Sequence, residues 1–255
     1  YYQCAGRSRI MTDHVHYDTI ILGAGAAGMM CAAKAAANGG RVLVIDHAKS
    51  AGDKIRISGG GRCNFTNMYI EPENFISENP HFAKSALSRY TQWDFIEMVA
   101  NYGIAYHEKT LGQLFCDGSA KEIIAMLRSE MDKVGVDLWL ETSLDELRHE
   151  DEFHVQVKRD DRYHFLRATN FVVACGGYSI PKMGATGLGY EIADYFGLPQ
   201  VATRPALVPL TFGGELLEEL ASMSGTALDA RMSFENSSFD ETILFTHRGM
   251  SGPAV

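Results

Sequence analysis

The stretch Thr19-Ile20-Ile21-Leu22-Gly23-Ala24-Gly25-Ala26-Ala27-Gly28 decides the fold, because an apolar run leads directly into a glycine-rich loop. The apolar run predicts a buried parallel strand, and the alanine-rich segment 26–38 predicts a helix that stops at Gly39-Gly40. A glycine loop between a strand and a helix lets backbone N–H groups approach a pyrophosphate at the helix N-terminus. Pyrophosphate contacts are therefore predicted for Gly23, Gly25, Ala26, Ala27 and Gly28.

An acidic residue follows at the distance that a dinucleotide requires. The apolar segment 41–45 predicts a second strand, and it ends at Asp46. This places a carboxylate roughly 20 residues past the glycines, where a ribose hydroxyl acceptor is expected. An acid there disfavours a 2′-phosphate, so the pattern favours FAD or NAD over NADP. The alternative is a strand–helix–strand unit whose small residues serve only tight packing.

A second glycine-rich loop follows the first closely, with the sequence Ser58-Gly59-Gly60-Gly61-Arg62-Cys63-Asn64-Phe65-Thr66-Asn67. Two such loops with an acid between them indicate a large dinucleotide held along much of its length. The expected cofactor is FAD, and the expected chemistry is oxidation and reduction. The residues of this loop predicted to contact the cofactor are Ser58, Gly60, Arg62, Cys63, Asn64 and Asn67.

The side chains of the second loop each have an ordinary alternative role. The Arg62 guanidinium can pair with anionic oxygens of the pyrophosphate or of the flavin edge, or it can be a solvated loop cation. Asn64 and Asn67 can orient the ribityl chain or can form Asx turns with their own backbone. Cys63 is interpreted as a small residue packed against the cofactor rather than as a reactive thiol, because the next cysteine in sequence is Cys116.

The composition is that of an ordinary globular protein, with 255 residues of which 46% are hydrophobic and 22% charged. The net charge is −9 and no basic stripe is present, which predicts that nucleic acid is not a partner. No stretch is long and apolar enough to cross a bilayer, so no membrane is expected. The five cysteines lack metal-ligand spacing and are odd in number, which predicts no metal site and a reducing cytoplasm. The pattern makes no prediction of oligomeric state.

The rest of the chain contains capping signals, turns and apolar runs that predict further elements. Thr91 with Asp94, and Ser119 with Glu122, are typical capping boxes at helix starts, and Asn79-Pro80 predicts a third start. Asp160-Asp161 predicts a turn within a short meander. The other predicted elements are strands over 136–140, 144–148, 153–158, 163–167 and 170–174, and a helix over 187–196.

Five segments together resemble one family: GAGAAGMMCA, SGGGRCNFTN, FVVACGGYSIPKMGATGLGYEIADYFG, PALVPL and LFTHRGMSGPAV. They are similar to the FAD-dependent NAD(P)/FAD oxidoreductases described as aminoacetone oxidase-like, which include bile-acid reductase-type flavoproteins. The resemblance implies an α/β fold, with a three-layer ββα FAD-binding, Rossmann-like domain and an inserted β-rich second domain. It implies an N-terminal extension over 1–16, the first part of the FAD-binding domain over 17–204, and the start of an incomplete inserted domain over 205–255. Members are longer, so the chain is expected to be a fragment that does not turn over alone.

The resemblance also implies further contacts. Gly176 and Gly177, after the apolar strand 170–174, resemble the second FAD-contacting turn of such folds. The segment 142–144, with Leu144, lies where related folds offer backbone groups to the adenine. His247 is the candidate catalytic residue, because histidine exchanges a proton near neutral pH while a flavin moves a hydride. A hydrogen-bonded loop histidine is the alternative.

The expected function is that of an FAD-dependent oxidoreductase that transfers a hydride between the flavin and a small organic substrate or NAD(P)H. NAD(P)H is expected to bind only transiently as reductant, since the glycine run 184–189 follows a loop rather than a buried strand. One alternative is a flavin-dependent tRNA-modifying enzyme, which the acidic balance disfavours. Another is a non-catalytic FAD-binding fragment.

Overall fold

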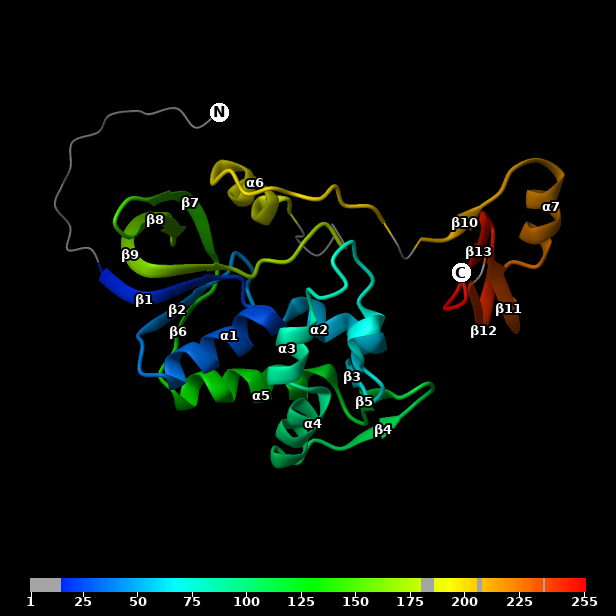
Figure 1. The fold of residues 1–255 in the computed structure, drawn as a ribbon, viewed down its shortest axis with the longest axis horizontal. Helices are drawn as coiled ribbons and strands as arrows, with labels where there is room; N and C mark the ends of the chain where they lie inside the picture. Colours follow the sequence, from blue (N-terminus) through cyan, green and yellow to red (C-terminus); the bar gives the residue numbers. More distant parts are fainter. Residues whose placement is uncertain (1–14, 180–185, 206–207, 236) are drawn as a thin grey trace. The chain divides into compact units, whose positions relative to one another are not determined.

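The computed structural model describes residues 15–179, 186–205, 208–235 and 237–255, in two compact units, Tyr1–Leu198 and Pro199–Val255 (Figure 1). Most of the predicted extension over 1–16 lies outside the described residues, although Val15 and His16 belong to the first strand. The predicted glycine run 184–189 also lies partly outside them. Each unit has its own hydrophobic core.

The first unit is built on a six-stranded sheet in the order β6-β2-β1-β9-β8-β7. The strands β6, β2, β1 and β9 run parallel to their neighbours, whereas β9, β8 and β7 form an antiparallel meander. This is the strand arrangement of a Rossmann-type fold with a meander attached. The bounds are β1 Val15–Leu22, β2 Val42–Ile45, β6 Asp137–Trp139, β7 Thr142–His149, β8 Phe153–Arg159 and β9 Arg162–Val173.

Strand β9 joins the two parts of this sheet. The segments 163–167 and 170–174 are predicted as separate strands, but the structure has one strand of 12 residues. Its first half pairs with β8 up to Ala168, and its second half pairs with β1 from Leu166 onward. No glycine or proline interrupts the chain between the two predicted segments, so the strand continues and changes partner.

Alternation of apolar residues produces the layers. On β1, Ile20 and Leu22 face the meander, whereas Ile21 faces the helices. On β2, Leu43 faces the meander and Val44 faces the helices. Helices α1 (Ala26–Ala37) and α5 (Ala120–Lys133) cover the helical side, and β7 to β9 curl over the other side (Figure 1). The three-layer ββα prediction is confirmed.

The predicted caps of two helices are confirmed. At α4 (Gln92–Asn101), the backbone N–H of Thr91 donates to Asp94 over 2.7 Å, and at α5 the N–H of Ser119 donates to Glu122 over 2.9 Å. The start predicted at Asn79-Pro80 is wrong, because α3 runs over Lys84–Arg89. The side chain of Asn79 accepts from the N–H of His81 and so forms an Asx turn instead of a helix cap.

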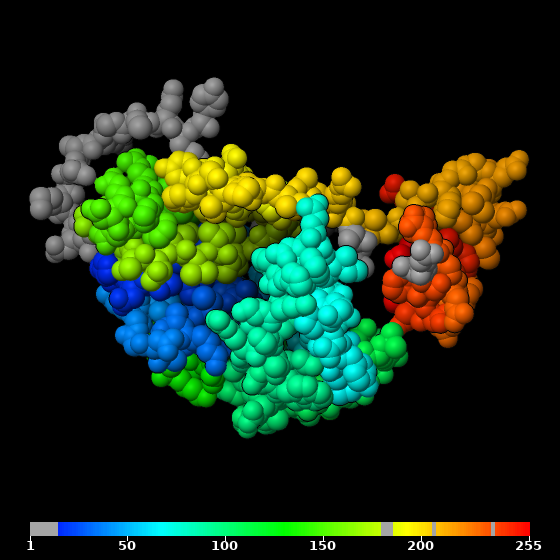
Figure 2. Space-filling model, viewed as in Figure 1, coloured from blue at the N-terminus to red at the C-terminus, as the bar shows by residue number. Residues whose placement is uncertain are grey.

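Several short elements complete the first unit. A three-stranded sheet has the order β3-β5-β4, and the segment between β3 and α3 stands out in cyan on the surface (Figure 2). Among the described residues, no helix has the length and apolar character needed to cross a bilayer. The bounds are α2 Asp53–Ile57, η1 Ser58–Gly61, β3 Asn64–Asn67, η2 Pro72–Asn74, β4 Tyr106–Glu108, β5 Gln113–Cys116 and α6 Leu188–Tyr195.

The second unit is a four-stranded antiparallel sheet in the order β10-β13-β12-β11, together with helix α7. Its core is small and contains Leu220, Ile243, Phe245 and Ala254. This is the β-rich second domain of the predicted fold class. The bounds are β10 Leu210–Thr211, α7 Gly214–Ser222, β11 Ala227–Phe234, β12 Ser237–Thr246 and β13 Gly249–Ser251.

The packing of α1 on the end of β1 gives a stability prediction. A Cβ added to Gly28 would lie 1.8 Å from the carbonyl oxygen of Gly23, whereas one added to Gly25 would meet no atom within 4 Å. We expect Gly28→Ala to lower the free energy of unfolding by about 2 kcal/mol, because the helix must move away from the strand. Gly25→Ala is the matched control and should change it by less than about 1 kcal/mol. Urea denaturation measures both, and equal effects would contradict the contact.

Candidate functional site

The first glycine loop divides into a packed part and an open part. Gly23 has a φ of +113°, and a Cβ there would lie 2.5 Å from the carbonyl oxygen of Ala174, at the end of β9. Gly23 and Gly28 therefore serve close packing, as the packing alternative holds. Gly25 does not, because the space around its Cα is open, and Ala26 and Ala27 are exposed.

The open part of this loop is also the N-terminus of α1. Gly25 is the N-cap residue, and no side chain caps the first turn. The first backbone N–H groups of a helix have no partner within the helix and attract negative charge. A cradle of exposed small residues at an uncapped N-terminus fits a pyrophosphate.

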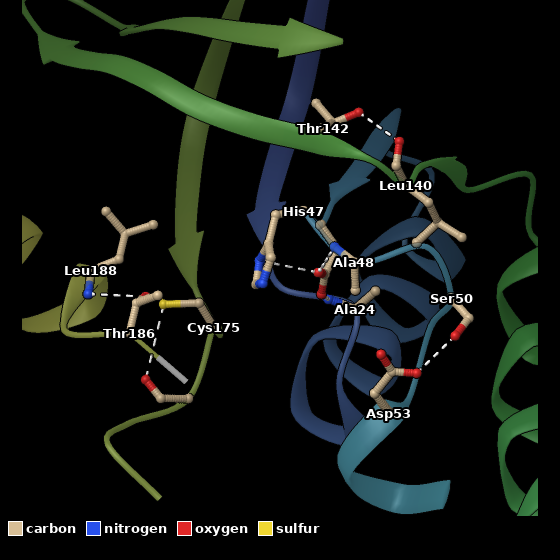
Figure 3. A network of polar contacts seen from close by, with 12 residues as sticks. Ala24, His47, Ala48, Ser50, Asp53, Leu140, Thr142, Cys175, Thr186 and Leu188 are labelled. Atoms are coloured by element: carbon tan, nitrogen blue, oxygen red, sulfur yellow. Dashed lines mark hydrogen bonds and ion pairs between the residues drawn. The ribbon is translucent and has the colours of Figure 1, made fainter. Parts of the chain in front are cut away.

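Asp46 ties the end of β2 to this loop. One carboxylate oxygen accepts the N–H of Ala24 over 2.6 Å, and the other accepts the N–H of Ala48 over 2.8 Å (Figure 3). The imidazole of His47 lies 3.5 Å from the carboxylate. Each carboxylate oxygen keeps acceptor capacity for a ribose hydroxyl. The sequence did not indicate that Asp46 also positions the glycine loop.

The start of β7 lies beside Asp46. The N–H of Thr142 donates to the carbonyl of Asp46 over 2.9 Å, and the N–H of Glu141 donates to the carbonyl of Ala48 over 3.0 Å. The hydroxyl of Thr142 donates to the carbonyl of Leu140 (Figure 3). Leu144 lies two residues further on, is half-buried, and packs in the core beneath the meander. The backbone near Thr142 is thus the part of the predicted segment 142–144 that adjoins Asp46, whereas the side chain of Leu144 is a core group.

The second glycine loop is a tight left-handed turn. Gly59, Gly60, Gly61 and Cys63 have φ values of 56°, 65°, 87° and 54°. A Cβ on Gly59 would lie 2.7 Å from the N of Asn64, but one on Gly60 would meet nothing within 4 Å. The hydroxyl of Ser58 donates to the carbonyl of Ile55 over 2.8 Å and holds the turn onto α2. As in the first loop, one glycine is packed and one faces open space.

The polar side chains of this loop have different surroundings. Arg62 is exposed, and its guanidinium has no hydrogen bond or ion pair with the residues that the structure describes. The amide of Asn67 donates to the carbonyl of Leu111 and accepts from the N–H of Tyr69, both over 2.8 Å, which is the Asx-turn alternative. Asn64, in the amide orientation that satisfies both side-chain atoms, donates to the carbonyls of Thr66 and Leu114. Of the Arg62, Asn64 and Asn67 side chains, that of Arg62 is the one with no partner among the described residues, which leaves its guanidinium available to a ligand.

Cys63 and Cys116 come close together in the fold. The carbonyl of Arg62 accepts the N–H of Cys116 over 3.0 Å, and both cysteines lie in the core beside α1 and α5. Burial raises the pKa of the Cys63 thiol and raises the pKa of Cys116 to about 12. Buried neutral thiols are poor nucleophiles, which agrees with a packing role. Among the described residues, no group of three His, Cys, Asp or Glu side chains is arranged to hold a metal ion.

The turn after β9 lies beside the first glycine loop and beside α2. The N–H of Ala174 donates to the carbonyl of Leu22 over 2.8 Å, next to the first loop. A Cβ on Gly176, which has a φ of +79°, would lie 3.4 Å from the Nζ of Lys54, three residues before the end of α2. Gly176 therefore lies beside α2, which leads into the second glycine loop, and the contact of Gly176 and Gly177 with a cofactor stays a prediction.

His247 lies in the second unit, in the turn between β12 and β13. His247 and its neighbour Arg248 are exposed, and the imidazole of His247 has no hydrogen bond or ion pair within the described part of the chain. The hydrogen-bonded alternative therefore gains no support from these contacts. The catalytic role of His247 stays a prediction.

A hollow of about 510 Å³ lies at the other end of α1. Lys34, Tyr90, Tyr102 and Glu130 are among its lining residues, and the hydroxyl of Tyr102 donates to Glu130 over 2.6 Å. No sequence motif predicted this hollow. Because Lys34 is near the C-terminus of α1, the hollow does not adjoin the glycine loops.

The fold and the two loops define a Rossmann-type nucleotide-binding protein with a β-meander layer. The chain belongs to the HI0933-like protein family, whose Rossmann-domain model matches residues 17–230. The prediction of a Rossmann-like domain is therefore confirmed.

Two curated relatives carry the same name. The chain is 51% identical over 94% of its length to a ribosomal RNA dihydrouridine synthase of Escherichia coli, and 46% identical over 93% to one of Haemophilus influenzae. It spans 59% and 60% of the length of these relatives. A 3-dehydro-bile acid Δ(4,6)-reductase of Clostridium scindens is 27% identical, over 84% of this chain and 51% of the relative. The predicted resemblance to bile-acid reductases is thus present, but at low sequence identity. The prediction of an enzyme family is confirmed.

A solved structure shows the same fold. The 3-ketosteroid-Δ4-(5α)-dehydrogenase of Rhodococcus jostii RHA1 aligns with a TM-score of 0.52 and 15% identity, over 66% of this chain and 48% of that chain. At this identity the likeness concerns the fold alone.

The prediction that nucleic acid is not a partner is wrong. The relatives at 51% and 46% identity are named for an action on ribosomal RNA. The prediction rested on the net charge of −9, which is a sum over the chain. Nucleic-acid contacts depend on where individual cationic and aromatic side chains lie, so the sum is a poor guide to them.

The two hydrogen bonds of Asp46 give a prediction that needs no cofactor. Asp46→Ala leaves the N–H groups of Ala24 and Ala48 without their acceptor. We expect the free energy of unfolding of the cofactor-free chain to fall by about 1–3 kcal/mol in urea denaturation. Asp151→Ala, which removes an exposed acid between β7 and β8, is the control. Equal stability of the two variants would show that Asp46 does not hold the loop.

The buried thiol of Cys116 gives a prediction for alkaline pH. An ordinary thiol ionises near pH 9, whereas burial raises the pKa of Cys116 to about 12. Between pH 9 and pH 12, therefore, the Cys116 thiol loses its proton in the unfolded chain but keeps it in the folded one. The free energy of unfolding should therefore fall as pH rises above 9. Cys116→Ala should make this fall shallower, by at most about 1.4 kcal/mol per pH unit. Denaturation at several pH values measures the slopes, and parallel slopes would contradict the buried thiol.

Proposed function

We propose that this chain binds FAD, and that the protein reduces uridine in ribosomal RNA to dihydrouridine. The observation that carries the proposal is the 51% identity, over 94% of the chain, to a ribosomal RNA dihydrouridine synthase. The open glycine loops and the acid between them support the cofactor. A cytoplasmic location is part of the same proposal.

The residues present fit an FAD molecule. Gly25, Ala26 and Ala27 offer an uncapped helix N-terminus to the pyrophosphate, and Asp46 offers acceptor oxygens to the adenosine ribose. Arg62 supplies an exposed guanidinium beside Gly60, whose surroundings are open. The remaining proposed contacts come from the backbone near Thr142 and from the turn at Gly176 and Gly177.

When bound, FAD supplies two-electron hydride chemistry, which few protein side chains can provide. Reduction of the C5–C6 double bond of uracil adds a hydride to one carbon and a proton to the other. The two electrons come from a reductant of the NAD(P)H class. The tasks left to the protein are to bind the dinucleotide, to orient the base, to exclude water and to deliver the proton.

We assign proton delivery to His247, and contact with an RNA phosphate to Arg248. Both side chains are exposed in the β12–β13 turn, so both are accessible to a large substrate. Histidine is the residue type best suited to exchange a proton near neutral pH, and arginine pairs well with phosphate oxygens. His247→Gln should lower the rate of reduction and leave FAD affinity unchanged.

The open space at Gly25 allows cofactor binding to be removed without unfolding. A valine there has room in the cofactor-free fold but would occupy the space of the pyrophosphate. We expect Gly25→Val to retain the circular dichroism of the wild type and to lose FAD affinity at least about 100-fold, measured by flavin fluorescence. Unchanged FAD affinity would overturn the placement of the pyrophosphate.

The reaction is tested with the full-length protein, FAD, NAD(P)H and a ribosomal RNA transcript that carries no modifications. Mass spectrometry of nucleosides should detect dihydrouridine with the wild type and none with Gly25→Val. The second candidate substrate class is a small unsaturated ketone, which the 27% identical bile-acid reductase supports. Reduction of such a ketone with no dihydrouridine formed would overturn the RNA proposal and leave FAD binding intact.

A further inference from the structure

Two tyrosines form a stack just after β9. The rings of Tyr178 and Tyr190 have centroids 4.8 Å apart and planes only 6° from parallel. Tyr178 is 57% exposed, although Tyr190 covers one of its faces. The exposure of Tyr178 therefore comes from its outer face and edge. Neither tyrosine has a role in the contacts proposed for FAD.

Two glycines leave the space that the hydroxyl groups of the stacked tyrosines occupy. A Cβ on Gly177 would lie 2.9 Å from the hydroxyl oxygen of Tyr190, and a Cβ on Gly187 would lie 2.7 Å from that of Tyr178. The hydroxyl of Tyr190 thus occupies the space that a side chain at position 177, in the turn after β9, would need. The hydroxyl of Tyr178 occupies the space that a side chain at position 187, at the start of α6, would need. A ring held in this way presents a face that is already ordered before a ligand arrives.

A cation lies next to the stack. The Nζ of Lys54 is 3.3 Å from the hydroxyl of Ser179, the residue that follows Tyr178. Lys54 belongs to α2, which leads into the second glycine loop, and the turn that carries Tyr178 follows Ala174 at the first loop. The exposed ring of Tyr178 and the ammonium of Lys54 therefore lie at the edge of the proposed cofactor site, on segments that connect to the two glycine loops.

We propose that Tyr178 is a stacking platform for a nucleobase of single-stranded RNA, and that Lys54 contacts the adjacent phosphate. This inference rests on the proposed function and names the residues that position its substrate. Sequence-tolerant binding of single strands combines aromatic faces, on which bases stack, with cations along the backbone. Tyr178, stacked on Tyr190 beside Lys54, has this combination at the edge of the site where the base must arrive.

The stacking contact is tested by RNA affinity rather than by turnover alone. The FAD-loaded full-length protein is titrated with a fluorescently labelled, single-stranded, uridine-rich RNA, and anisotropy is measured. Tyr178→Ala should raise the Kd about 5- to 150-fold, the range that loss of one base–aromatic stack gives. Tyr178→Phe should stay close to the wild type because it keeps the ring. The matched control is Tyr163→Ala, since Tyr163 is 54% exposed but lies on the meander.

The phosphate contact is tested by salt dependence. Lys54→Gln should weaken RNA binding and reduce the slope of log affinity against log salt by about 0.7, the change expected for one phosphate contact on a single strand. Lys121→Gln, at an exposed position of α5, is the matched control and should leave the slope unchanged.

A direct contact is tested by photocrosslinking. RNA that carries 5-bromouridine should crosslink to the peptide containing Tyr178, and Tyr178→Ala should lose this crosslink. Flavin absorbance, read in the same samples, should be the same in all variants. If Tyr178→Ala changes flavin affinity but not RNA affinity, the stack serves the cofactor and the inference is wrong. If the wild type binds no RNA and forms no dihydrouridine, the proposed function itself fails.

Discussion

The close contact between the carbonyl of Gly23 and the Cα of Gly28 is the constraint on which the first unit depends. A Cβ on residue 28 would lie only 1.8 Å from that oxygen. No residue other than glycine at position 28 therefore lets α1 leave the sheet at this angle. Gly23 in turn lies against the backbone of Ala174, so β1, α1 and β9 meet at one point. Asp46 adds β2 to this junction through the N–H of Ala24. The first glycine loop and Asp46, two of the proposed dinucleotide contacts, are therefore held by these backbone contacts.

Local pattern explains why the sequence predicted so much of this unit. The first strand, α1, β2 and the capping boxes of α4 and α5 are each encoded within a few residues, by periodicity, glycine stops and cap side chains. The continuity of β9 is different, since it depends on two partners from distant parts of the chain, β8 and β1. Asn79 shows the remaining ambiguity, because the same side chain can cap a helix or close an Asx turn.

The two glycine loops were predictable from the sequence, but the surroundings of their individual residues were not. Glycines in a strand–loop–helix setting marked the loops, yet only the structure separates Gly25 and Gly60, which face open space, from Gly28 and Gly59, which are packed. Asn67 was a candidate ligand residue, and its amide is already used by Leu111 and Tyr69. The net charge misled for a related reason, since it holds no information on where Lys54 or Arg62 lies.

Strand β9 links the chemistry to the fold. Its first half is the inner strand of the meander, its second half is the neighbour of β1, and its end leads to Gly176, Gly177 and Tyr178. In the proposed function, the turn that passes the cofactor and the ring that receives the base are successive residues of one chain segment. Their relative position is therefore set by the short backbone that joins them and by the stack that holds the Tyr178 ring on Tyr190, which is the condition for presenting a base to a cofactor in a constant orientation.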